Sequence, residues 1–387
     1  GRTTQALYLV EARAAQTGWT SDLSRQAGDL WDVLGDRSLA LDYWEAASRA
    51  TAPSAAFLRA LAQAAIELGQ WTAAKAALTR LLAVDPDDAW AHLQLGLIEA
   101  AFDARAAESH LRAALREPAY RDLVVPLLDA LRAASDDPLL SMRVGLALAS
   151  LDQWSYAELA FEHAAAMNVP FPLALAYQGL ARDRQGKDGS AQVEQALALA
   201  PDNAEVQLLF GLHLRQRGDY PGSLSALADA VTLNPENPAL YAELAAGYRL
   251  LRDLTQAEYW LRMAVAVSHN DRRFLELLAL FYADESGTLT EGGLAALEQT
   301  AAQLEDDPDV LAGLGWTLVL AGQADRGIAQ IDRALELAPD NPRALLYKGR
   351  TLLDRGDVEG ALGFLRRAAN TDSSFADEAR ALLAAYE

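Results

Sequence analysis

Cysteine is absent from the 387 residues of this chain. Its absence excludes disulfide bonds, thiolate metal sites and a cysteine nucleophile, and it leaves the redox compartment undecided. Histidine is scarce as well, and no two histidines have the sequence spacing of a metal site: His92, His110, His163, His213 and His269. We therefore expect neither a metal nor a cofactor.

Long apolar runs are also missing, so the sequence predicts neither a segment that spans a bilayer nor a signal peptide. Positive charge is in deficit: 33 Lys and Arg against 54 Asp and Glu give a net charge of −21. This balance disfavours nucleic acids and anionic membranes as partners. The chain starts with Gly1 and not with methionine, which leaves open that a targeting or anchor segment was removed. We expect a soluble fragment from a bacterial cytoplasm or periplasm, and the sequence does not decide between the two.

Catalytic signatures are missing too. The sequence contains no Gly-x-Ser-x-Gly motif, no P-loop and no dinucleotide-binding glycine motif after a strand. The acidic clusters at 85–88 and 305–309 precede predicted helices, where carboxylates cap free amides, and they lack the ligand spacing of a calcium loop. We expect no enzyme activity and assign no catalytic residue.

What the sequence does have is a regular series of small residues. Two antiparallel helices approach closely only where side chains are short, so each small residue marks a predicted helix crossing. Most intervals are about 34 residues, a period typical of helical repeats. The series is Gly28, Ala62, Gly96, Gly145, Gly179, Gly211, Ala245, Ala279, Gly315 and Gly349.

The segment 202–237 shows one unit of this series clearly. Gly211 lies in a first amphipathic helix, the turn at 217–220 ends that helix, and Pro235 follows a second one. The chain thereby resembles the tetratricopeptide repeat (TPR) family, over almost its whole length and in about ten units. The motif residues include Gly211, Tyr220, Ala230 and Pro235, then Tyr241, Leu244, Tyr248, Ala257 and Ala264, and later Gly315, Ala334, Pro339, Gly349, Gly356, Ala361 and Ala368.

The resemblance implies an all-α fold, a right-handed α-solenoid in which antiparallel helix pairs form a superhelix. The predicted domain organisation has five parts: an orphan helix at 1–20, repeats 1–3 at 21–121, an extra helix or junction at 122–137, repeats 4–10 at 138–375 and a capping helix at 376–387. The orphan helix is either a truncated repeat or a cap. The junction is either a border between two sub-arrays or a repeat that lost one helix.

In similar proteins the first helices of the repeats line an inner face that binds peptides or helices. The chaperone-binding members carry a Lys and Asn clamp for carboxylates on this face, and here those places hold mainly Leu and Ala, so that activity is not implied. An apolar face with Arg182, Arg215 and Arg249 at its rim predicts an amphipathic partner segment. The predicted groove residues are Leu93, Leu97, Met142, Leu146, Ala176, Leu180, Leu208, Leu212, Arg215, Ala246 and Arg249. The alternative is that tight stacking of the repeats covers these side chains.

The sequence therefore predicts a non-catalytic scaffold that binds a peptide or an amphipathic helix of a partner protein. One alternative is a structural protein that assembles with copies of itself. Another is the repeat region of a larger, membrane-anchored or enzymatic protein. The sequence identifies neither the partner nor the oligomeric state.

Overall fold

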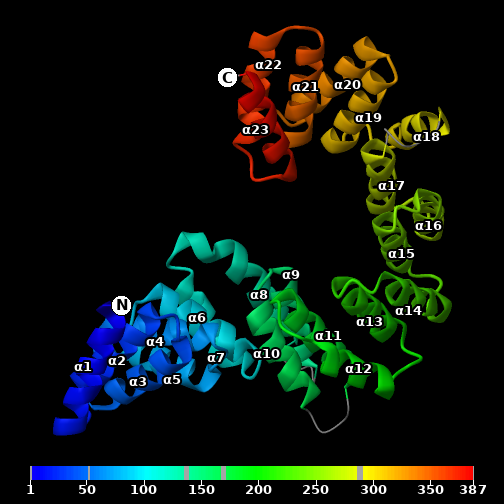
Figure 1. Ribbon diagram of the computed structural model, residues 1–387. Helices are drawn as coiled ribbons and strands as arrows, with labels where there is room; N and C mark the ends of the chain where they lie inside the picture. The colour runs from blue at the N-terminus through cyan, green and yellow to red at the C-terminus, as the bar shows by residue number, and fades with distance from the viewer. Residues whose placement is uncertain (1, 51–52, 135–138, 167–170, 286–290, 387) are drawn as a thin grey trace. The chain divides into compact units, whose positions relative to one another are not determined.

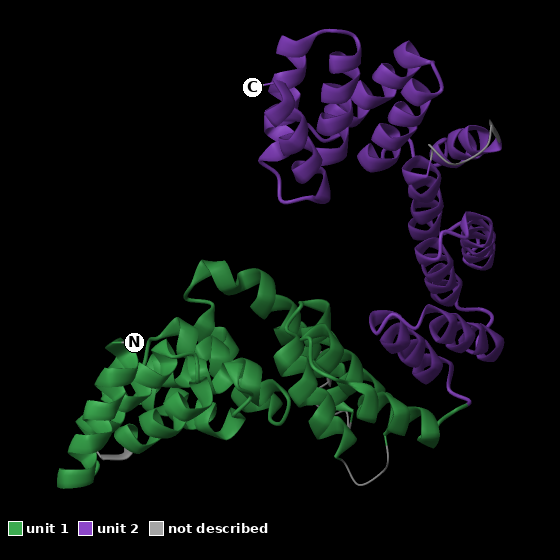
Figure 2. Ribbon diagram, in the orientation of Figure 1, with its two compact units in different colours: residues 1–201 green, residues 202–387 purple. Residues whose placement is uncertain are grey.

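A computed structural model of the chain describes residues 2–50, 53–134, 139–166, 171–285 and 291–386. Within these ranges there are twenty-three α-helices, one 3-10 helix and no strand (Figure 1). The predicted all-α fold is confirmed. None of the described helices has the length and apolar character needed to cross a membrane. The chain divides into two compact units, unit 1 at Gly1–Pro201 and unit 2 at Asp202–Glu387 (Figure 2).

Unit 1 consists of helix pairs in which each second helix packs back on the first. Helix α1 (Arg2–Thr17) precedes the pairs and packs on α2, and η1 (Pro118–Tyr120) and α8 (Arg121–Ala134) lie between the third and fourth pairs. The pairs are α2 (Ser21–Val33) with α3 (Arg37–Ala50), α4 (Ala55–Glu67) with α5 (Trp71–Val84), α6 (Ala89–Ala100) with α7 (Ala104–Ala114), α9 (Leu140–Ser150) with α10 (Trp154–Ala165), and α11 (Pro172–Arg184) with α12 (Ser190–Leu199).

Unit 2 repeats the same arrangement and ends with α23 (Ser374–Tyr386), which packs on α22 and α21. First helices of successive pairs also touch, α17 with α19 and α19 with α21. The pairs are α13 (Ala204–Gln216) with α14 (Tyr220–Leu233), α15 (Pro238–Leu250) with α16 (Leu254–Val267), α17 (Arg272–Asp284) with α18 (Glu291–Ala301), α19 (Pro308–Leu320) with α20 (Ala324–Leu337), and α21 (Pro342–Asp354) with α22 (Val358–Ala369).

The small residues lie at the helix crossings, as the sequence predicts. A Cβ atom added to Gly211 would be 2.9 Å from Cγ of Leu227 on the second helix of its pair. At Gly315 the added atom would be 2.6 Å from the carbonyl oxygen of Gly327, which is backbone and cannot turn aside. Side-chain volume at these positions therefore sets how closely the two helices of a pair approach.

Polar residues fix the helix starts. In the first acidic cluster, Oδ1 of Asp88 accepts a hydrogen bond from the amide of Ala91 at 2.9 Å. In the second, Oδ1 of Asp307 accepts from the amides of Asp309 at 3.0 Å and Val310 at 3.1 Å. Both clusters thus contain the N-cap of the following helix, the role expected of carboxylates there.

The segment predicted as an extra helix or junction contains α8, whose residues Val124, Leu127 and Leu131 are buried in the core of unit 1. Residues 135–137 of that predicted segment lie outside the described residues. The border between the two compact units follows Pro201. The five-part domain organisation stays a prediction.

Candidate functional site

Four of the predicted groove residues belong to the packed interior. Leu93 and Leu97 on α6, Met142 on α9 and Ala176 on α11 are all at most 5% exposed. Neighbouring helices cover these side chains, so a partner cannot contact them. For these four positions the structure corrects the prediction in favour of its alternative, coverage by repeat stacking.

The other apolar residues of the predicted groove keep accessible surface. In unit 1 these are Leu146 on α9, which is 38% exposed, and Leu180 on α11, which is half-buried. In unit 2, Leu208 and Leu212 on α13 are half-buried and Ala246 on α15 is exposed. These residues stay candidates for partner contact.

Helix α17 extends the accessible apolar surface of unit 2. Leu280 occupies the place in α17 that Leu212 has in α13 and Ala246 in α15, and it is half-buried. Leu277, which the sequence reasoning did not select, is 45% exposed. Leu277 lies three residues before Leu280, and residues three apart lie on one face of a helix. This spacing could have identified Leu277 from the sequence. We call Leu208, Leu212, Ala246, Leu277 and Leu280 the first-helix face of unit 2.

The predicted arginine rim is paired within the chain. In unit 2, Nη2 of Arg215 on α13 lies 2.8 Å from Glu243 on α15. Arg249 on α15 contacts Glu285 at 2.9 Å and Asp284 at 3.2 Å, at the end of α17. In unit 1, Arg182 lies 2.9 Å from Glu158. The ion pairs in unit 2 join α13 to α15 and α15 to the end of α17, and they neutralise the charges beside the first-helix face.

In α19 and α21, the apolar residues at the places that match Leu208 and Leu212 of α13 are buried. Ala312, Trp316 and Leu346 are at most 8% exposed. The Trp316 ring stacks on Tyr347 with centroids 5.1 Å apart, and the guanidinium of Arg350 lies 4.6 Å from the centre of the Trp316 ring. At these matching places, apolar side chains are therefore accessible on α13, α15 and α17 and buried on α19 and α21.

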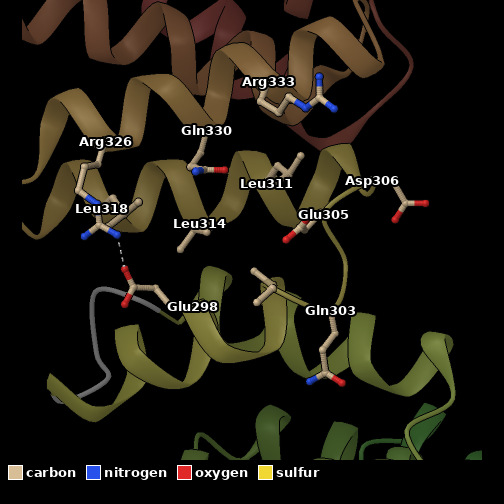
Figure 3. A pocket seen from close by; sticks show the side chains of 12 residues that line it. Glu298, Gln303, Glu305, Asp306, Leu311, Leu314, Leu318, Arg326, Gln330 and Arg333 are labelled. Atoms are coloured by element: carbon tan, nitrogen blue, oxygen red, sulfur yellow. Dashed lines mark hydrogen bonds and ion pairs between the residues drawn. The ribbon is translucent and has the colours of Figure 1, made fainter.

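A hollow of about 800 Å³ lies beside α18 in the same unit (Figure 3). Helix α18 has 11 residues within the described part of the chain. Figure 3 shows Arg326, Gln330 and Arg333 along α20, with leucines of α19 between them and α18. An ion pair of 2.8 Å joins Arg326 to Glu298 across the hollow. Its remaining lining residues are Ala301, Ala302, Gln303, Glu305, Asp306, Leu311, Leu314 and Leu318.

The structure brings together two histidines, His92 and His110, although their sequence spacing is not that of a metal site. Nδ1 of His92 on α6 lies 2.9 Å from Nδ1 of His110 on α7, and Nε2 of His110 lies 3.7 Å from Oε2 of Glu99. Residues on the two helices of a pair meet at an offset set by the turn, so no local spacing signals this contact. Among the described residues no three His, Cys, Asp or Glu side chains are grouped so that they could hold a metal ion.

Ser141 and His163 resemble a nucleophile and base in distance but not in hydrogen-bond direction. Oγ of Ser141 lies 2.8 Å from Nδ1 of His163 and 2.8 Å from the carbonyl oxygen of Ala101. A hydroxyl has one proton, and the carbonyl can only accept, so Ser141 donates to Ala101. His163 must then donate to Ser141, which is the reverse of the arrangement that activates a serine nucleophile.

Comparison with known proteins adds the family. Two profiles described as tetratricopeptide repeat match the chain, one at 178–238, 208–273 and 312–377 and the other at 55–98. Together these ranges cover more than half of the chain. No curated protein sequence matches it significantly.

Several solved structures are similar to this chain at low identity. Yeast Tom70 is 14% identical, with 94% of this chain and 95% of that chain covered and a TM-score of 0.41. A tetratricopeptide repeat protein from Parabacteroides merdae is 15% identical over 62% of this chain and 95% of its own, with a TM-score of 0.47. YrrB, a TPR protein described as having an unusual peptide-binding site, is 18% identical over 49% and 97%, with a TM-score of 0.34. TM-scores below 0.5 do not indicate a shared binding site.

Proposed function

Because the chain belongs to the tetratricopeptide repeat family, we propose that it is a non-catalytic scaffold that binds an apolar segment of a partner protein on the first-helix face of unit 2. Members of this family bind protein partners, and the fold is typically non-catalytic. The proposal adds the location of the site and the chemistry of the bound segment.

One observation carries the proposal: three successive first helices of one unit keep apolar side chains accessible at matching places. These are Leu212 on α13, Ala246 on α15 and Leu280 on α17, whereas Trp316 at the same place on α19 is buried. Removing apolar surface from water stabilises a complex by about 25 cal/mol per Å². Accessible apolar side chains on successive first helices suit an extended peptide or one face of an amphipathic helix.

Charge defines the rest of the partner segment. Arg215 and Arg249 beside the face already have carboxylate partners, so acidic residues of a ligand gain little there. The whole chain has a net charge of −21. We therefore expect an apolar centre with basic flanks, since long-range attraction to an acidic protein speeds association of a basic segment.

The test is the substitution Leu212→Arg, which places a charge in the middle of the face. Lost apolar contact and the cost of desolvating the arginine should each remove about 1–3 kcal/mol of binding free energy, and 1.4 kcal/mol is tenfold in affinity. Wild-type protein captures the partner from an extract of the source organism, and its affinity for wild type and variant is then measured by titration. Circular dichroism should show an unchanged helical fold.

Leu233→Arg is the matched control, because Leu233 is a 41% exposed leucine at the end of the second helix α14. It should bind the captured partner like wild type. Equal affinity of the Leu212→Arg protein and wild type would contradict the proposed face. Equal losses in both variants would show a general effect of added charge and would also contradict it.

A further inference from the structure

A buried carboxylate in the third helix pair of unit 1 has one oxygen without a hydrogen-bond donor. Glu99 on α6 is 7% exposed. Oε1 of Glu99 lies 2.9 Å from Nζ of Lys75 on α5, while Oε2 has no hydrogen-bond partner in the part of the chain that the structure describes. Nε2 of His110 on α7 faces that oxygen at 3.7 Å. An unsatisfied buried acceptor is costly, so the protonation state of His110 matters here.

The hydrogen bonds around the two histidines define where each proton sits. Nε2 of His92 lies 3.0 Å from the carbonyl oxygen of Pro86, which can only accept, so His92 has its proton on Nε2. Nδ1 of neutral His92 is then an acceptor. His110 therefore donates from its own Nδ1 across the 2.9 Å contact, and neutral His110 has no proton on Nε2.

The hydrogen bonds that link Pro86, His92 and His110 leave Nε2 of neutral His110 without a proton to donate to Glu99. With both rings neutral, the lone pairs of His110 Nε2 and Glu99 Oε2 face each other at 3.7 Å, and the buried Oε2 has no donor among the described residues. A single proton on His110 Nε2 would place a cationic donor at ion-pair distance from Oε2, 3.7 Å, and would leave the contacts to His92 and Pro86 unchanged. No other single proton does this on the His110 ring, because Nδ1 already holds one.

We propose that His110 is a proton-binding switch between α6 and α7: its Nε2 takes up a proton in mildly acidic solution and shares it with Glu99. The charged groups around it act in both directions. From α6 the Glu99 carboxylate favours the imidazolium, and His92 opposes it; from α5 the Lys75 ammonium opposes it. On α8, Arg132 is in ion pairs with Glu108 and Asp129.

Burial has the largest effect on the pKa of His110 and lowers it. Glu99 raises this pKa, whereas His92 and Lys75 lower it. The net result is a pKa below the ordinary value of 6.5. A histidine whose pKa is lower in the folded chain than in the unfolded chain contributes stability above about pH 6.5. That contribution is lost as the pH falls through the folded pKa. Acid should therefore loosen the α6–α7 pair, because the shared proton only partly offsets the cost of a buried imidazolium.

The test is nitrogen NMR of the full chain with labelled histidine, since the ring nitrogens report which atom is protonated. At pH 8 we expect the Nδ1–H form for His110 and the Nε2–H form for His92. On acidification His110 should gain its second proton at Nε2 with a midpoint below 6.5. Exposed His269 in unit 2 serves as the internal reference for a ring in solvent. An Nε2–H form of His110 at pH 8 would overturn the proposal.

Two variants shift the midpoint in opposite directions. Glu99→Gln keeps the shape and removes the charge that favours the imidazolium, so the midpoint of His110 should fall by about one pH unit. Lys75→Met removes the opposing ammonium, so the midpoint should rise. A midpoint that does not move in either variant contradicts the sharing of the proton with Glu99. The tautomers of the wild-type protein test the proposal even where a variant fails to fold.

Discussion

At the scale of single residues, the helix crossings differ in how much added volume they tolerate. The space beside Gly211 is limited by the side chain of Leu227, which can change rotamer, whereas the space beside Gly315 is limited by the backbone of Gly327. An added methyl group at Gly315 must therefore push two helices apart. We expect crossings closed by backbone to be the least tolerant of substitution.

Gly315→Ala should lower the free energy of unfolding by about 1–3 kcal/mol, the usual cost of overpacking. Gly363→Ala is the control, because Gly363 lies in helix α22 and an added Cβ has no neighbour within 4 Å. Alanine favours a helix by about 1 kcal/mol relative to glycine, so the control should gain stability. Urea denaturation of both proteins measures the difference, and equal effects of the two substitutions would argue against tight packing at Gly315.

The sequence was most informative where structure is local. The period of small residues such as Gly211 and Gly315 predicted the helix pairs, because the two helices of a pair are joined by a short turn. It was less informative about Leu97 and Met142, whose burial depends on the neighbouring repeats. The contact between His92 and His110 was missed, because the rotation of each helix about its axis decides which side chains meet.

At the scale of helices and turns, two of the described turns between paired helices have a residue other than glycine in the left-handed region. Most of the described turns between paired helices place one residue in the left-handed region, as at Gly218 with φ of 82°. In the turn between α9 and α10 that residue is Asp152 with φ of 58°, and between α15 and α16 it is Arg252 with φ of 60°. A residue with a Cβ is strained there by roughly 1–2 kcal/mol, and Asp tolerates the conformation better than Arg.

Asp152→Gly should therefore raise the stability of unit 1 by up to about 1 kcal/mol, since glycine removes the strain of the left-handed residue. Asp152 is the better choice of the two, because its side-chain contact is an exposed local hydrogen bond that it accepts from Nε1 of Trp154. Arg252 contacts the buried Glu285 at 3.0 Å, and its substitution would break that ion pair. Asp152→Ala is the control and should lower stability, since alanine keeps the strain and cannot form local polar contacts. A thermal melt in which the glycine variant unfolds earlier than wild type would contradict this account of the turn.

At the scale of the whole molecule, the chain has no single core. The buried clusters that run from Tyr241 to Leu318 and from Leu311 to Leu383 lie entirely in unit 2, and the largest cluster of unit 1 runs from Ala40 to Ala181. Neighbouring repeats share each cluster, so stability should be a sum of repeat and interface contributions. Truncating the chain between two helix pairs removes a whole interface between repeats. Truncating it within a pair exposes the apolar surface that the two helices of that pair bury against each other.

A fragment of residues 202–387 should consequently fold by itself. It contains every helix pair of unit 2 together with α23, and its buried clusters are complete. We expect a helical circular dichroism spectrum and a cooperative urea transition. The control is a fragment of residues 254–387, which begins at α16 and lacks α15. Leu261 and Ala264 on α16 are buried in the whole chain and would lose the cover of α15, so this fragment should be less stable or aggregate. If 202–387 is unfolded while the full chain is folded, the repeats behave as one continuous array and unit 2 depends on the helices that precede it.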